Sequence, residues 1–234
     1  EPFGDVFDFG HAGVDFFFVL SGFIIAYAHR ADIGRPGRWR DYAWKRFRRI
    51  YPPYWVITAL LVPVFFLAPG WGVGHERQAG TILCSFLLLP HPTGPLLGVA
   101  WSLCNEVLFY AAFLAFIAGR RIGLVVFATW FLYVVLPIGP RPFPLSFLGD
   151  LRHLQFFLGM IGAAIYVRRT VPLPRTLALV GAAVFLGAGV VETYTRWLGP
   201  SALLVGYGVG SLGIVLGLAE AERSGGLRVP RIFS

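Results

Sequence analysis

The stretch Trp101–Tyr110, WSLCNEVLFY, places one carboxylate, Glu106, in a run that is otherwise apolar enough to cross a membrane. A carboxylate at bilayer depth costs several kcal/mol unless it is protonated, hydrated or paired, so intramembrane acids commonly mark functional sites. In a helix, Ser102, Glu106 and Tyr110 fall at positions i, i+4 and i+8 and share one face. Because this polar stripe cannot face lipid, we expect it to face other helices or a watery cavity.

The composition is that of a polytopic membrane protein. Of 234 residues, 56% are hydrophobic and only 14% are charged, whereas soluble domains carry about 25% charged residues. The net charge of +8 does not indicate nucleic-acid binding, because so apolar a chain offers no broad water-facing surface for a duplex. Neither the two cysteines, Cys84 and Cys104, nor the histidines have metal-ligand spacing, so no metal site is predicted.

Seven segments are apolar over a length that can span a bilayer, which takes roughly 17 to 25 helical residues. We therefore expect an all-α transmembrane bundle that forms a single membrane-embedded domain over residues 1–234. The shorter apolar run 81–90 is predicted to be re-entrant or interfacial. The seven predicted spans are 12–29, 52–69, 100–118, 122–138, 151–167, 175–192 and 201–219.

Basic residues predict the orientation of these spans. The loop 30–49 holds eight Lys and Arg residues, and every second connection after it is also basic. Such loops lie in the cytoplasm, so residues 30–49 are predicted to be cytoplasmic and residues 1–11 extracytoplasmic. The first ten residues lack the basic region of a signal peptide.

A second notable stretch is GVDFFFVLSGF at 13–23. Asp15 lies near the outer end of its predicted helix, where a carboxylate suits the helix dipole, and Ser21 lies deeper among aromatic residues. Ser21 either takes part in chemistry or bonds back to its own helix, with Gly22 admitting a neighbouring helix. The sequence leaves both interpretations open.

The third stretch, RWRDYAWKRFRRIYPPYW at 38–55, gathers Lys45, Arg46 and Arg49 where a basic segment meets the membrane. Pro52 and Pro53 are expected to start the next span. Segments of this kind often only bind anionic lipid headgroups and set the topology. Arg is also the preferred partner of phosphate, so the alternative is a site for a nucleotide-bearing cofactor that enters from the cytoplasm.

Together the three stretches resemble the integral-membrane acyltransferase-3 family, which includes O-acetyltransferases of bacterial surface glycans. GVDFFFVLSGF at 13–23 looks like the family's G-V-x-x-F-F-x-x-S-G-F, RFRRIYPPYW at 46–55 looks like R-x-x-R-I-x-P-x-Y-W, and WSLCNEVLFY at 101–110 looks like W-S-L-x-x-E-x-x-F-Y. The resemblance implies roughly ten helices. It also implies transfer of an acyl group, often acetyl, from cytoplasmic acyl-CoA to a hydroxyl on an extracytoplasmic acceptor.

The resemblance assigns Arg46 and Arg49 to the acyl-CoA side, together with the neighbouring Lys45, and Glu106, Ser21 and Tyr110 to the transfer cavity. Family members carry an Arg, and some ten residues later a His thought to be the base, in a helix before the first motif. We expect this chain to be a piece that lacks that helix and the C-terminal helices. His11, next to the first motif, is not assigned the role of the base.

Two other functions stay open from the sequence. One is a transporter or flippase for a glycan or lipid precursor, in which Glu106 relays protons or binds substrate. The other is a non-catalytic membrane scaffold.

In the acyltransferase interpretation we expect a multi-pass protein of the bacterial inner membrane. Its partners would be membrane lipids, acyl-CoA as the donor substrate and a glycan acceptor, with no resident cofactor and no nucleic acid.

Overall fold

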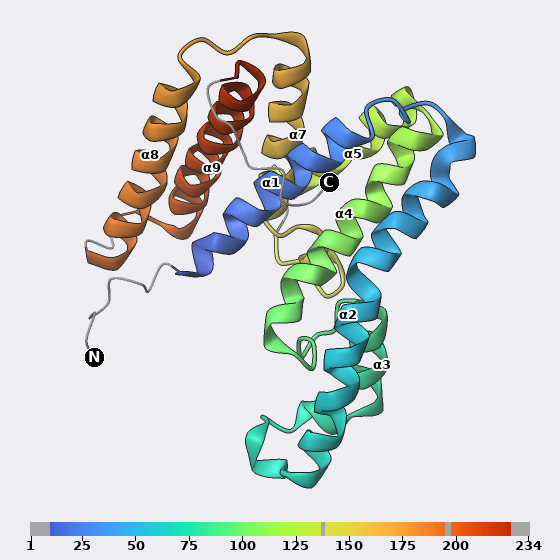
Figure 1. Ribbon diagram of the computed structural model, residues 1–234. Helices are drawn as coiled ribbons and strands as arrows, with labels where there is room; N and C mark the ends of the chain where they lie inside the picture. The colour runs from blue at the N-terminus through green and yellow to red at the C-terminus, as the bar shows by residue number, and fades with distance from the viewer. Residues whose placement is uncertain (1–9, 137–138, 195–197, 226–234) are drawn as a thin grey trace. The chain divides into compact units, whose positions relative to one another are not determined.

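The computed structural model describes residues 10–136, 139–194 and 198–225, and this part of the chain is helical throughout, without a strand. The predicted all-α class is therefore confirmed. Figure 1 shows the course of the chain. The α-helices are α1 (Ala12–Ala28), α2 (Trp39–Leu67), α3 (Ala79–Leu87), α4 (Trp101–Ala118), α5 (Arg120–Val135), α6 (Leu145–Leu148), α7 (His153–Arg168), α8 (Pro174–Tyr194) and α9 (Pro200–Arg223).

Within the described residues, four helical segments are long and apolar enough to cross a membrane. A helix also lies at each of the seven predicted spans, but α1 has 17 residues and α5 and α7 have 16 each. A membrane helical protein is supported, while the count of seven spans stays a prediction. The four long segments are Pro36–Leu67, Gly98–Ala118, Pro174–Tyr194 and Pro200–Arg223.

The helix that contains the predicted span 52–69 does not begin at Pro52, because α2 begins at Trp39 and runs through Pro52 and Pro53; that the membrane span itself starts at these prolines stays a prediction. A proline inside a helix removes one backbone hydrogen bond and crowds the preceding turn. In α2 one face stays buried across the prolines, with Tyr42 and Ile50 before them and Tyr54 after them. This continuous buried face offsets the cost of the prolines.

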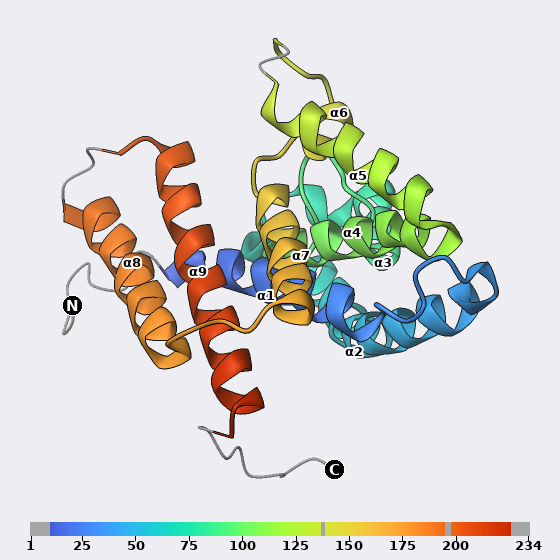
Figure 2. The same ribbon diagram turned by 90° about the horizontal axis from the view of Figure 1, so that it is seen from above.

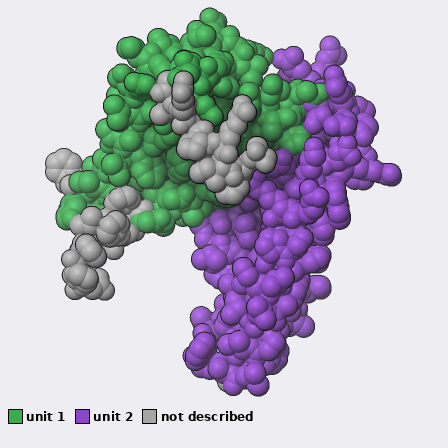
Figure 3. All heavy atoms as spheres, viewed as in Figure 1, with its two compact units in different colours: residues 1–31, 151–234 green, residues 32–150 purple. Residues whose placement is uncertain are grey.

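Residues 1–31 and 151–234 form one compact unit, unit 1, and residues 32–150 form a second, unit 2 (Figure 3). The short helix α3, which belongs to unit 2, lies where the re-entrant segment 81–90 is predicted. Its relation to a membrane stays a prediction, as does the single domain over 1–234.

In unit 1, glycines let helices approach at backbone distance. The pairs α1 with α7 and α8 with α9 lie side by side (Figures 1 and 2). A methyl group on Gly22 of α1 would overlap the carbonyl oxygen of Phe156, and one on Gly159 of α7 would overlap that of Val19. On α8, a Cβ at Gly181 would lie 2.6 Å from the Ile214 nitrogen. The interpretation of Gly22 as the residue that admits a neighbouring helix is thus confirmed.

In unit 2, α2 and α4 run antiparallel. The Gly34 amide, before α2, donates to the carbonyl of Phe116 near the end of α4 at 2.9 Å. Further along, the Tyr42 hydroxyl donates to the carbonyl of Tyr110 at 3.1 Å. The opposite side of α4 packs on α5 through phenylalanine rings, with the centroids of Phe116 and Phe127 5.0 Å apart. These contacts hold α4, and with it Glu106, between two helices.

Candidate functional site

Helix α4 brings two of the three residues of the predicted polar stripe together. The Glu106 side chain is only 3% exposed, and the Tyr110 hydroxyl, one turn further on, donates to its carboxylate. Ser102 does not join them: its hydroxyl donates to the Val99 carbonyl at 3.0 Å, at the beginning of α4. The buried acid is thus paired within its own helix, as its position in an apolar run requires.

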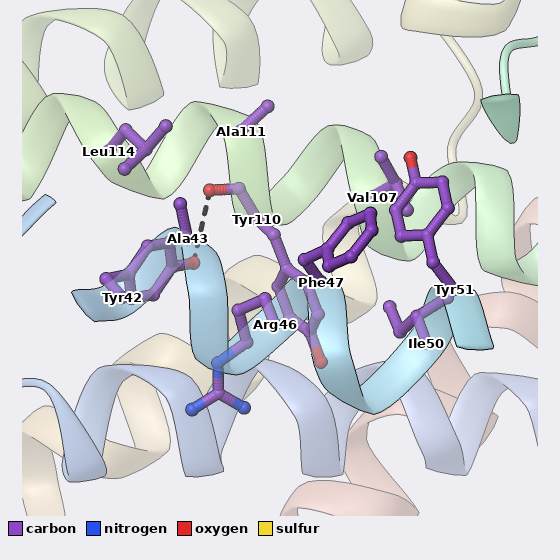
Figure 4. Close-up of a pocket in the computed structure, with 10 residues that line it drawn as sticks. All are labelled: Tyr42, Ala43, Arg46, Phe47, Ile50, Tyr51, Val107, Tyr110, Ala111 and Leu114. Carbon is purple, nitrogen blue, oxygen red and sulfur yellow. Dashed lines mark hydrogen bonds between the residues drawn. The ribbon is translucent and has the colours of Figure 1, made fainter. Parts of the chain in front are cut away.

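Helix α2 adds a tyrosine and an arginine. Tyr42 is buried and is joined to the Tyr110 carbonyl, as the dashed line in Figure 4 marks. One turn further on, the guanidinium carbon of Arg46 lies 5.5 Å from the ring centre of Tyr110 and 5.8 Å from that of Tyr42. A guanidinium at this distance from an aromatic ring is attracted to it. Tyr110 therefore contacts Glu106 with its hydroxyl and Arg46 with its ring.

The position of Arg46 along α2 explains why aromatic rings lie beside its guanidinium. It lies seven residues after Trp39, where α2 begins, so it is about 10 Å along a helix that rises 1.5 Å per residue. Partial burial of a guanidinium is costly unless polar or polarisable groups lie beside it. The rings of Tyr42 and Tyr110 lie beside the Arg46 guanidinium and supply such groups.

Beside this cluster lies a pocket of about 150 Å³ between α2 and α4 (Figure 4). Arg46 and the tyrosines form one part of its wall, and aliphatic side chains form most of the rest. The volume is below the roughly 300 to 1,000 Å³ typical of sites for drug-sized ligands, and suits a small acyl group better than a whole nucleotide. The lining residues are Tyr42, Ala43, Arg46, Phe47, Ile50, Tyr51, Val107, Tyr110, Ala111 and Leu114.

The structure does not gather all the residues predicted from the sequence. Lys45 and Arg49 are exposed on α2, on either side of the half-buried Arg46, and do not line the pocket. Ser21 is buried in α1, which belongs to unit 1. Its place in a transfer site, like the cofactor-binding role of Arg49 and Lys45, stays a prediction.

Tyr42 is a residue of the candidate site that the sequence motifs do not single out. The spacing of Tyr42, Arg46, Ile50 and Tyr54, each four residues from the next, places them on one face of a helix. This spacing is the signal that points to Tyr42, and it requires a helix that continues through Pro52 and Pro53, as α2 does.

The long apolar helices indicate a membrane protein, and within unit 2 a buried acid is joined to Tyr110, which lines a pocket together with Arg46. The chain belongs to the acyltransferase-3 family, whose model, described as an acyltransferase domain, matches residues 2–233. The resemblance seen in the three sequence stretches is thereby confirmed.

One curated relative is the exopolysaccharide production protein ExoZ of Rhizobium meliloti strain 1021. It is 35% identical to this chain over 121 residues, which are 48% of this chain and 36% of the relative. The match thus spans about a third of the relative's length. No solved structure matches this chain.

Proposed function

We propose that this chain forms membrane-embedded machinery that moves an acyl group, acetyl in particular, from cytoplasmic acyl-CoA to a hydroxyl of an extracytoplasmic carbohydrate or lipid-linked glycan. The observation that carries the proposal is the buried Glu106–Tyr110 pair beside Arg46, at the edge of a small and mainly apolar pocket. Membership of the acyltransferase family supports the reaction type. The name of the relative, an exopolysaccharide production protein, supports a polysaccharide acceptor.

Each group has a part in the proposed transfer. The acceptor hydroxyl attacks the thioester carbonyl, a carbon–oxygen bond forms, and the carbon–sulfur bond to CoA breaks. The hydroxyl proton passes to the base that the family resemblance implies in a helix before residue 13, and the CoA thiolate leaves. Glu106, held by Tyr110, orients or polarises the reacting groups. The guanidinium of Arg46, with Arg49 and Lys45, pairs with CoA phosphate oxygens.

The experiment replaces the carboxylate by its amide. We expect Glu106→Gln, in the full-length protein in membranes, to lower transfer of radiolabelled acetyl from acetyl-CoA by roughly a hundredfold or more, the usual loss when a proton-handling side chain is removed. The acceptor is the cell-surface polysaccharide of the source organism, freed of esters by mild alkali. Protein levels are compared by immunoblot.

Glu222→Gln is the matched control, because Glu222 is exposed near the end of α9. It should leave transfer unchanged. Equal activity of Glu106→Gln and wild type would remove Glu106 from the mechanism. Absence of transfer by the wild type with every acyl-CoA tried would count against an acyltransferase and favour transport or a scaffold.

A further inference from the structure

Unit 2 contains a second and larger pocket, of about 290 Å³, at the other end of α4. Its walls come from the loop that follows α3, from the first turn of α4, and from α6 with the residues before it. The residues that line it are Pro90, His91, Pro92, Gly94, Pro95, Trp101, Cys104, Phe143, Ser146 and Phe147. None of these ten carries a carboxylate, an ammonium or a guanidinium group.

The lining combines aromatic surface with a few neutral polar groups. Trp101, Phe143 and Phe147 supply rings, whose faces carry partial negative charge and attract the partly positive edges of a ligand. Ser146 supplies a hydroxyl and His91 an imidazole. Such a wall suits a neutral ligand with apolar C–H faces and hydroxyl edges, which describes a sugar ring. Without a cationic side chain it does not suit the phosphates of CoA.

The walls of the pocket are anchored from outside it. The Leu96 amide donates to the buried Ser85 hydroxyl at 2.8 Å and holds the loop after α3. On the other wall, the Trp130 indole donates to the carbonyl of Leu148, the last residue of α6, at 2.9 Å. Phe143 nevertheless keeps 41% of its surface exposed. The pocket is therefore largely formed in advance, with an apolar ring left uncovered at its edge.

Helix α4 links this pocket to the candidate site. Cys104 lines the pocket and Glu106 follows two residues later, so they lie about 3 Å apart along the helix axis and on roughly opposite sides of the helix. Both connections that form the walls, the one before α4 and the one before α7, are poor in basic residues. By the distribution of Lys and Arg they face away from the cytoplasm. An acceptor outside the cell could reach the pocket from that side.

We propose that this pocket binds one sugar ring of the acceptor glycan, stacked on the rings of Phe143 and Phe147, next to the turn of α4 that carries Glu106. This inference rests on the proposed transfer to a carbohydrate and adds the residues that select the acceptor. The pocket takes no part in the chemistry in this proposal. Loss of the pocket should therefore weaken binding of the acceptor and leave binding of the donor unchanged.

The test separates acceptor from donor. In the full-length protein we expect Phe143→Ala to raise the KM for the de-esterified polysaccharide roughly tenfold, since one lost aromatic contact is worth about that factor. The KM for acetyl-CoA and the kcat should stay unchanged, and Phe143→Tyr, which keeps the ring, should restore the acceptor KM. Leu145→Ala is the matched control, because Leu145 is exposed in the same segment but does not line the pocket.

Binding without the donor distinguishes the two proposals. Saturation-transfer NMR with oligosaccharides cut from the same polysaccharide should show contact with the wild type that Phe143→Ala loses. If the wild type transfers acetyl and Phe143→Ala keeps the wild-type acceptor KM, the pocket proposal is overturned and the proposed function stands. If the sugar signal is present and depends on Phe143 while no acyl transfer occurs, the pocket stands and the proposed function fails. No sugar signal with the wild type overturns the pocket proposal.

Discussion

The hydroxyl, the ring and the backbone carbonyl of Tyr110 each contact a different residue. Its hydroxyl donates to Glu106, its ring lies against the Arg46 guanidinium, and its carbonyl accepts the hydroxyl of Tyr42. A phenylalanine at this position would keep the ring and the carbonyl but would leave the buried Glu106 carboxylate without this donor. A tyrosine at i+4 from Glu106 therefore contacts both the acid and the Arg46 guanidinium with one side chain.

Among single residues, the substitution Arg46→Lys tests whether the planar guanidinium of Arg46 is needed for binding the donor. Lysine keeps the charge but lacks the planar fork that pairs with phosphate and stacks on rings. We expect the KM for acetyl-CoA to rise roughly tenfold, the effect of losing about 1.4 kcal/mol of binding. Steady-state kinetics at normal protein level measures it.

Arg48→Lys serves as the control for that substitution, because Arg48 is exposed on the same helix and does not line the pocket. Its donor KM should match the wild type. Equal effects of the two substitutions would mean that only the general positive charge of the segment matters.

At the scale of elements, the contact between α1 and α7 depends on two glycines that face one another's helix. Gly22 belongs to the motif shared with the acyltransferase family, yet the structure shows it packed against the backbone of Phe156. Gly159 lies equally close to the backbone of Val19. Backbone atoms cannot move aside as a side chain can, so any Cβ here must push the helices apart.

We therefore expect Gly159→Ala to destabilise the protein by about 1 to 3 kcal/mol, the usual cost of overpacking. Thermal unfolding in detergent, followed by circular dichroism, should show a lower Tm. Gly13→Ala, on α1, is the control, because a Cβ there meets nothing within 4 Å and alanine favours a helix. A Tm for Gly159→Ala equal to that of Gly13→Ala would contradict this account of the α1–α7 contact.

At the scale of the whole molecule, the distribution of basic residues predicts which connections face the cytoplasm. Two exposed positions in unit 2 test it: Gly37, just before α2, and Val73, in the connection between α2 and α3. After replacement of Cys84 and Cys104 by alanine, a membrane-impermeant maleimide should label Val73→Cys on intact cells and should not label Gly37→Cys. After lysis both should react. The reverse pattern on intact cells would invert the orientation of this part of the chain.

Local patterns in the sequence were enough to predict the class of the protein and the burial of Glu106 in a helix. Hydropathy and helical periodicity are local properties, so a helix lies at each predicted span and Glu106 and Tyr110 meet as their spacing of four residues predicts. The family followed from three motifs for the same reason, since each is a short contiguous stretch.

The contacts between side chains of different helices could not be predicted in this way. Tyr42 reaches Tyr110 across 68 positions in sequence, and the buried face of α2 carries that helix through Pro52 and Pro53 against their local preference. Ser102, which shares the periodicity of Glu106, bonds instead to the backbone at the start of α4. Such contacts depend on how helices pack against one another; the spacing of residues along one helix shows which of them share a face, but not which residues of another helix that face meets.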